Sequence, residues 1–243
     1  MSSAKGQQGD ELAYVLHTYP FRDTSVIVEA FTRSHGRIGL VARGAKRPKS
    51  ALRPALLAFQ PLSLAWSGRA ELRTLTRAEW VGNTRMLIGV SMMCGYYLNE
   101  LLLKLLQRDD PHEYLFDAYA QALEHLAAAE GTESVLRRFE ITLLREIGYA
   151  LELEREPERG TPLVAEQRYS YLPERGPAVV RDESAARGAV ELRGKTLLDM
   201  ARGDYSDPQT AAESKALMRA LIGRHLDHRA LHTRQLLLEL NKL

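Results

Sequence analysis

The chain has 243 residues, of which 45% are apolar and 26% are charged, and its formal net charge is +2. These values are close to those of ordinary globular proteins, so they exclude a wholly disordered chain. The single cysteine, Cys94, excludes an intrachain disulfide and a multi-cysteine zinc site, and its apolar surroundings predict a buried thiol. The polar first residues and the lack of a long apolar run predict no secretory signal, no membrane span and a cytoplasmic location.

The first 82 residues predict a small β-barrel domain. β-Branched and aromatic residues mark strands at 11–19, 25–32 and 36–45, and a hairpin follows over 60–81. A short apolar piece around Pro54 predicts one helical turn between them. Five short strands with one brief helical insert favour an oligonucleotide-binding (OB) fold. An SH3-like barrel is the alternative on pattern alone.

Residues 83–243 predict a mainly helical domain. A long apolar segment over 86–107 predicts a largely buried helix. The next helix is expected to begin at Asp110, with Pro111 at its first position and Glu113 completing a capping box. A third helix is expected over 132–149. The predicted fold class is therefore α+β, with a five-stranded barrel followed by a helical domain.

An irregular insert interrupts the helical domain at about 152–194, where proline, glycine and charged residues are frequent. Within it, 168–172 and 178–181 are expected to pair as a small β-hairpin. Two more helices are expected, one beginning near Asp207 and one over 228–240.

Two patterns that suggest catalysis or metal binding are weak. The residues Gly-Lys-Thr at 194–196 lack the glycine that a phosphate-binding loop needs at 189, so we expect them to begin a short helix. His225, His228 and His232 share one helical face and could hold zinc, but no acidic residue completes a catalytic set. A histidine face exposed to solvent or nucleic acid is favoured. The sequence therefore predicts no catalytic residues, no metal and no cofactor.

The sequence between Ala30 and Ala70 contains eight cationic residues and no acidic one. A surface of this composition attracts phosphate backbones, because neutralising them releases counterions. A solvated charged face would normally mix both signs, so nucleic acid is the favoured ligand and an acidic partner protein is the alternative. The residues predicted to bind DNA are Arg33, Arg37, Arg43, Lys46, Arg47, Lys49, Arg53, Arg73 and Arg77.

Aromatic residues are interleaved with these cations. Phe31, Phe59 and Trp66 are expected mainly in the barrel core. For Tyr19 and Phe21 two interpretations stay open, because they can either fill the core or stack on unpaired bases.

Three segments together resemble the RecO family of bacterial DNA repair proteins. They are DTSVIVEAFTRSHGRIGLVARGAKRPKS at 23–50, YYLNELL at 96–102 and LRRFEITLLREIGY at 136–149. The resemblance implies an OB fold followed by a helical domain, a place at the bacterial nucleoid and a non-enzymatic role in recombinational repair. Such proteins bind single- and double-stranded DNA and anneal complementary strands. With RecR, they help load RecA onto DNA covered by single-strand-binding protein (SSB).

Two details of the resemblance concern the helical domain. Many family members carry a four-cysteine zinc site after the third helix, whereas residues 150–193 contain no cysteine here. The resemblance also implies docking of the acidic, apolar-ended SSB tail. Arg137 and Arg138, beside Leu136 and Phe139, are the predicted tail-binding residues. The alternative is an ordinary helix surface on which Arg138 pairs with a glutamate.

Overall fold

The computed structural model describes residues 7–82, 84–173, 175–180, 188–226, 231–233 and 235–236. The chain divides into two compact units, one of Met1–Glu130 with Leu231–Leu243 and the other of Gly131–Ala230. The predicted boundary between residues 82 and 83 falls inside the first unit and stays a prediction.

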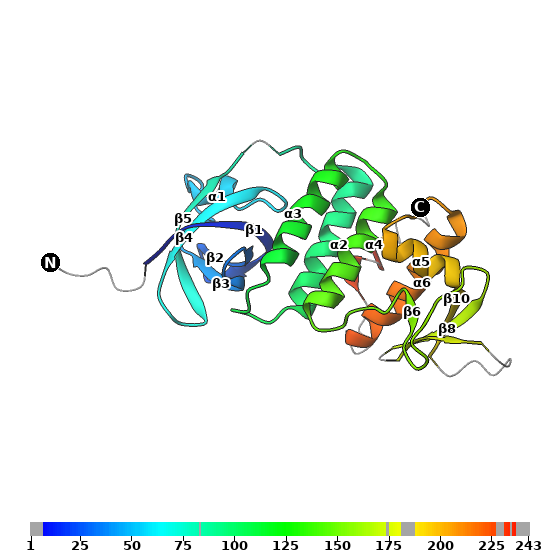
Figure 1. Cartoon of the computed structure of the whole chain (residues 1–243). Helices are drawn as coiled ribbons and strands as arrows, with labels where there is room; N and C mark the ends of the chain where they lie inside the picture. The colour runs from blue at the N-terminus through cyan, green and yellow to red at the C-terminus, as the bar shows by residue number, and fades with distance from the viewer. Residues whose placement is uncertain are drawn as a thin grey trace. The chain divides into compact units, whose positions relative to one another are not determined.

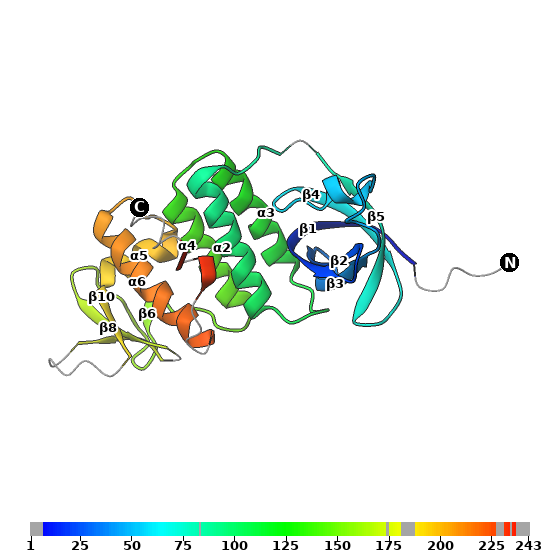
Figure 2. The ribbon, with the colours of Figure 1, turned by 180° about the vertical axis from the view of Figure 1, so that it is seen from behind.

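The first unit begins with a closed five-stranded barrel. Its elements are β1 (Gln7–Phe21), β2 (Ser25–Thr32), β3 (Gly36–Ala42), α1 (Leu52–Ala55), β4 (Pro61–Ser67) and β5 (Leu72–Trp80). The strands follow the order β1-β2-β3-β5-β4, and only the β3–β5 pairing, among these, is parallel. This is the predicted OB-fold barrel, with its short helix α1 between β3 and β4 (Figure 1), and Figure 2 shows the same strands from behind.

Every second residue along each strand points inward and fills the barrel. The inward set includes Ala13, Val15, Val28, Ala30, Ile38, Leu40, Leu62, Leu64, Trp66 and Leu75. Trp66 is 3% exposed, as its predicted core position requires. This period of two is typical of a strand with one buried face, and for this reason the strands could be predicted from the alternation of apolar residues in the sequence.

Two helices of the first unit, α2 (Gly89–Leu105) and α3 (Glu113–Ala127), follow the barrel. Phe31 is fully buried on the outer side of β2, where its ring centroid lies 5.4 Å from that of Phe116. Tyr14 of β1 lies 5.5 Å from the same ring. The predicted burial of Phe31 is confirmed, but its core lies between the barrel and α3 and not inside the barrel.

The predicted start of the second helix at Asp110 is wrong. The N–H of Asp109 donates to the carbonyl of Arg37 over 2.9 Å, so the chain still runs beside β3 at this point. The approach is so close that a Cβ on Gly36 would lie 1.8 Å from the Asp110 carbonyl oxygen. At this contact the chain forms a turn, with Asp109 at φ 61°, and α3 begins only at Glu113.

The second unit combines helices with short strands. Its elements are α4 (Thr132–Glu146), β6 (Arg155–Glu156), β7 (Thr161–Pro162), β8 (Arg168–Leu172), β9 (Gly176–Val179), β10 (Val190–Arg193), α5 (Gly194–Arg202) and α6 (Pro208–His225). The predicted hairpin is present as β8 and β9, and β10 adds a third strand that was not predicted. In the part of the chain that the structure describes, no helix has the length and apolarity to cross a bilayer.

The helix starts of this unit follow the predicted chemistry. Gly194 begins α5, so the residues Gly-Lys-Thr at 194–196 start a short helix, as predicted. The side chain of Asp207 accepts a hydrogen bond from the Gln209 N–H over 2.9 Å and caps α6. Of the last predicted helix, 232–233 and 235–236 are helical and the other residues of 228–240, except Leu231, lie outside the described part.

Glu100 of α2 caps the start of this last helical segment within the first unit. Its carboxylate accepts hydrogen bonds from the His232 N–H at 2.8 Å, the Thr233 N–H at 3.0 Å and the Thr233 hydroxyl at 2.7 Å. Lys104 lies 2.8 Å from the same carboxylate. Burial alone would raise the pKa of Glu100, but the hydrogen bonds from Lys104, Thr233 and His232 outweigh it and lower the pKa to about 2.

Replacing Glu100 by glutamine should destabilise the protein by about 1.5 kcal/mol at neutral pH, because a charged acceptor is lost. The depressed pKa stabilises the fold above the ordinary value of 4.5, and this contribution disappears as the pH falls through about 2. The difference between variant and parent should therefore shrink toward zero in acid. Urea unfolding at several pH values measures it, with exposed Glu124→Gln as the control. A difference independent of pH would contradict the proposed cap.

Candidate nucleic-acid interface

Five of the nine predicted DNA-binding residues lie together on the chain after β3. They are Arg43, Lys46, Arg47, Lys49 and Arg53, and all five are exposed. Within the described residues, none of them forms an ion pair with an acidic side chain. Their charges are therefore available to an anionic ligand.

Backbone hydrogen bonds give this loop its shape. Gly44 has φ 69°, a conformation that favours glycine, and its carbonyl accepts from the Arg47 N–H over 3.0 Å. The Lys46 N–H donates to the Thr24 carbonyl over 2.9 Å. The Lys46 ammonium also donates to the carbonyl of Arg22 over 3.2 Å. The loop is thus fastened to the turn between β1 and β2.

This connection brings in one cation that the sequence analysis missed. Arg22 is exposed in the β1–β2 turn, and its guanidinium carbon lies 5.2 Å from the centre of the Phe21 ring. In the sequence it stands beside Asp23 and outside the acid-free stretch, so no local signal marks it. We call the set Arg22, Arg43, Lys46, Arg47, Lys49 and Arg53 the basic cluster.

The other four predicted residues have acidic partners. The pairs are Arg33 with Glu113 at 2.6 Å and Asp117 at 3.0 Å, Arg37 with Glu29 at 3.3 Å, Arg73 with Asp109 at 2.6 Å, and Arg77 with Asp10. The hydrogen bond with Asp117 is the largest cause of the raised pKa of Arg33. These carboxylates compete with phosphate for the same cations, so we expect weaker DNA contacts here.

A row of three side chains on the outer barrel surface adjoins the basic cluster. Tyr19 of β1 is 45% exposed and stands opposite Ile27 of β2, which in turn stands opposite Val41 of β3. Residues directly opposite each other share one face of a sheet, so the three side chains form a row. Of the two interpretations left open by the sequence, exposure favours stacking for Tyr19.

Arg137 and Arg138, the predicted tail-binding residues, have different surroundings on α4. Arg137 is only 8% exposed and pairs with the fully buried Glu140. Arg138 is exposed and donates to the carbonyl of Gly203 over 2.8 Å. The ion pair with a glutamate that the sequence suggested for Arg138 is therefore formed by Arg137 instead.

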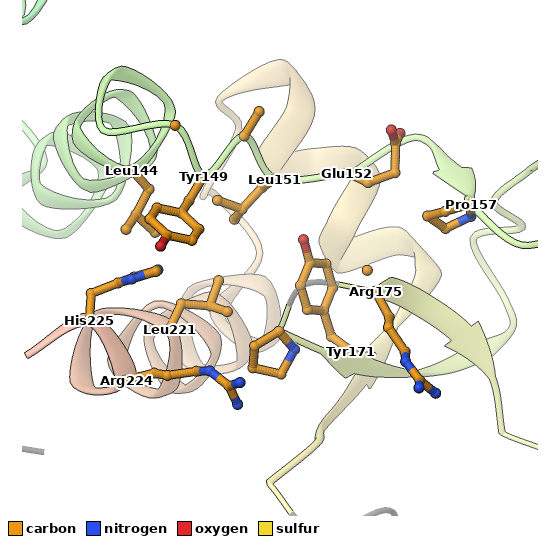
Figure 3. A pocket seen from close by; sticks show the side chains of 14 residues that line it. Leu144, Tyr149, Leu151, Glu152, Pro157, Tyr171, Arg175, Leu221, Arg224 and His225 are labelled. Carbon is orange, nitrogen blue, oxygen red and sulfur yellow. The ribbon is translucent and has the colours of Figure 1, made fainter. Parts of the chain in front are cut away.

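Two pockets of the second unit lie near these helices. Arg138 borders one of about 520 Å³, which also has the acidic residues Glu133 and Asp204 in its wall. The other, of about 390 Å³, lies between the end of α4, α6 and the β8–β9 hairpin (Figure 3).

The second pocket has an apolar side and a cationic side. Figure 3 shows Tyr149 above His225, with Leu144 and Leu221 beside them, and the two rings are 3.8 Å apart between centroids. Arg224 also lines it, together with Arg175 and the acidic Glu152. An apolar group that carries a negative charge fits this lining.

The structure shows the surroundings of the two weak sequence patterns, Gly-Lys-Thr at 194–196 and the three histidines. Lys195 pairs with Asp199 of its own helix and lies 3.2 Å from Asp207, so its charge is already compensated. Of the three histidines, His225 packs against the Tyr149 ring at an angle of 49°, and His228 lies outside the described residues. Across the described ranges, no group of three or more His, Cys, Asp or Glu side chains is placed to hold a metal ion.

Comparison with known proteins gives matches along nearly the whole chain. The family model "Recombination protein O N terminal" matches residues 10–84, and "Recombination protein O C terminal" matches residues 89–235. The DNA repair protein RecO of Polynucleobacter asymbioticus is 50% identical over 238 residues, which cover 96% of this chain and 97% of the relative. The DNA repair protein RecO of Nitrosospira multiformis is 50% identical over 243 residues, which cover both chains completely.

Proposed function

Because the chain belongs to the RecO family of DNA repair proteins, we propose that it is a recombination mediator that binds DNA through the basic cluster. It binds single and double strands, anneals complementary strands and, with RecR, helps load RecA onto SSB-covered DNA. The observation that carries the DNA-binding part is the exposure of five predicted cations that have no acidic partner within the described residues.

Phosphate contacts suit annealing, because they hold strands without reading their sequence and leave the base edges free to pair. Two complementary strands repel each other through their phosphates. Cations that neutralise both backbones in one place reduce this repulsion. In this proposal the barrel of residues 1–82 acts by binding and no residue acts as a catalyst, so the protein is not an enzyme.

The alternative is an interaction adaptor whose basic cluster binds an acidic protein. Binding of an oligo(dT) strand, followed by fluorescence anisotropy, distinguishes the two functions. The mediator should bind the strand and should accelerate pairing of two complementary oligonucleotides. Failure to bind either single or double strands, with retained binding to an acidic protein, would favour the adaptor.

The SSB tail is proposed to dock on the second unit. Its apolar end and its acidic residues match the lining of the pocket in Figure 3, where Arg224 stands close to Leu221 and Arg175 lies on the other side of Tyr171. Arg138, predicted from the sequence, borders the pocket that contains two acidic residues. We therefore assign the apolar end of the tail to the pocket of Figure 3 and keep Arg138 as the second test position.

Charge reversal distinguishes the two positions. Arg224→Glu should weaken binding of an SSB tail peptide about tenfold, because a charge-assisted contact of about 1.5 kcal/mol or more is replaced by repulsion. Annealing of naked strands should be unchanged, whereas annealing of SSB-covered strands should slow. Arg138→Glu is the matched variant, and calorimetry with the peptide measures both. If only Arg138→Glu weakens the peptide, the tail binds at Arg138 instead.

A further inference from the structure

We propose that His17, Tyr19 and Phe21 of β1 form a stacking strip for unpaired bases, and that Asn99 of α2 positions this strip. The proposal rests on the DNA-binding function proposed above and names the form of DNA that the site prefers. Stacking needs bases that are not already stacked and paired in a duplex, so the ligand is single-stranded DNA.

A β-bulge turns these three rings outward. Val15 pairs with Ala30 and His17 pairs with Glu29, so one extra residue, Leu16, is inserted in β1. Ala13 and Val15 point into the barrel. Without the insertion, the alternation of the strand would send positions 17, 19 and 21 inward as well. With it, they share the outer face, and Tyr19 is 45% exposed.

Asn99 holds the bulge from α2. Its side-chain N–H donates to the carbonyl of Leu16 over 2.9 Å, and its side-chain oxygen accepts from the Tyr119 hydroxyl over 2.6 Å. Asn99 is 2% exposed, and Tyr119 is fully buried. Burial raises the pKa of Tyr119 well above its ordinary value, so the hydroxyl keeps the proton that it donates. The amide is thereby oriented with its donor toward the bulge.

The rings already contact one another and the basic cluster. The centroids of His17 and Tyr19 are 4.4 Å apart, at an angle of 61° between the rings. Phe21 lies under the guanidinium of Arg22, a member of the basic cluster. A strand whose phosphates follow the cluster therefore has aromatic faces within reach of its bases.

The other aromatic residues of β1 and β2 are covered. Tyr14 and Phe31 are buried against Phe116 of α3. The bulge thus separates a part of β1 that packs on the helix from a part that is open to a ligand. This division explains why the same strand carries both core and exposed aromatic residues.

Tyr19→Ala tests the strip. Affinity for oligo(dT) should fall about tenfold, equivalent to about 1.4 kcal/mol and within the range for one base stacked on an aromatic ring. Affinity for a duplex should stay within about twofold, and the salt dependence should not change, because no cation is lost. Tyr114→Ala, on α3 and 59% exposed, is the control. Equal binding of oligo(dT) by Tyr19→Ala and the parent would overturn the strip.

Asn99→Ala tests the positioning role. It should lower the affinity for oligo(dT) as Tyr19→Ala does and spare the duplex, and the double variant should be no weaker than either single one. Tyr119→Phe is a milder change and should give a smaller loss of the same kind. Additive losses, or equal losses for single strand and duplex, would overturn the role of Asn99. If the parent binds no DNA, the proposed function fails; if only the Tyr19 result fails, that function stands.

Discussion

Replacing Lys46, Arg47 and Lys49 by alanine should weaken binding of single-stranded DNA about 50-fold at roughly 0.15 M salt. Each neutralised phosphate contributes about 0.7 to the slope of log K against log salt for a single strand. Three lost contacts therefore make the slope about 2 units less steep. At roughly 0.15 M salt this change lowers the binding constant about 50-fold. The loss should be equal for strands of different sequence, since phosphates carry no sequence information.

A matched variant excludes a simple effect of net charge. Arg145, Arg168 and Arg202 are exposed on the second unit, and their triple alanine variant removes the same charge from other surfaces. It should bind DNA nearly as the parent does. Circular dichroism checks that both variants are folded. If the two triple variants lose affinity equally, the basic cluster is not the DNA site.

Arg137→Met should lower the free energy of unfolding by about 3 kcal/mol, because it removes the cation beside a buried carboxylate. Glu140 is fully buried, and methionine keeps the apolar stem of the arginine while deleting its charge. Thermal unfolding should shift down by about 6–12 °C for a protein of this size. The same geometry means that Arg137→Glu would place two carboxylates together in the interior and would report on folding before it reports on tail binding.

Two further variants isolate the pair. Arg138→Ala on the same helix removes an exposed donor to the Gly203 carbonyl and should cost about 1 kcal/mol or less. The double variant Arg137→Met with Glu140→Leu should regain much of the stability, because no charge is then left buried without its partner. An Arg137→Met protein as stable as the parent would show that the pair is not important for folding.

Local periodicity was sufficient for most of the fold. The strands of the barrel alternate at a period of two, and α4 and α6 lie where helical spacing and the cap at Asp207 predict them. The predicted start of α3 was wrong. The contact of Asp109 with Arg37 of β3 delays the helix, and these two residues are more than 70 positions apart along the chain. A capping box describes only neighbouring residues and contains no information about such a contact.

At the candidate site, too, local sequence patterns could not reveal contacts between distant parts of the chain. An acid-free stretch of sequence is not an acid-free surface, since Glu113 and Asp117 of α3 reach back to Arg33. Conversely, Arg22 joins the basic cluster only because the barrel brings its turn to Lys46. The outward direction of Tyr19 depends on a single inserted residue, which shifts the phase of the strand and cannot be recognised from alternation alone.

The salt dependence of oligo(dT) binding by the parent protein tests the central proposal most directly. If the six cations of the basic cluster each neutralise one phosphate, log K should fall against log salt with a slope of about −4. The slope should be the same for oligonucleotides of different sequence. A slope near zero, or no binding of single strands at low salt, would contradict a DNA-binding surface built from these residues.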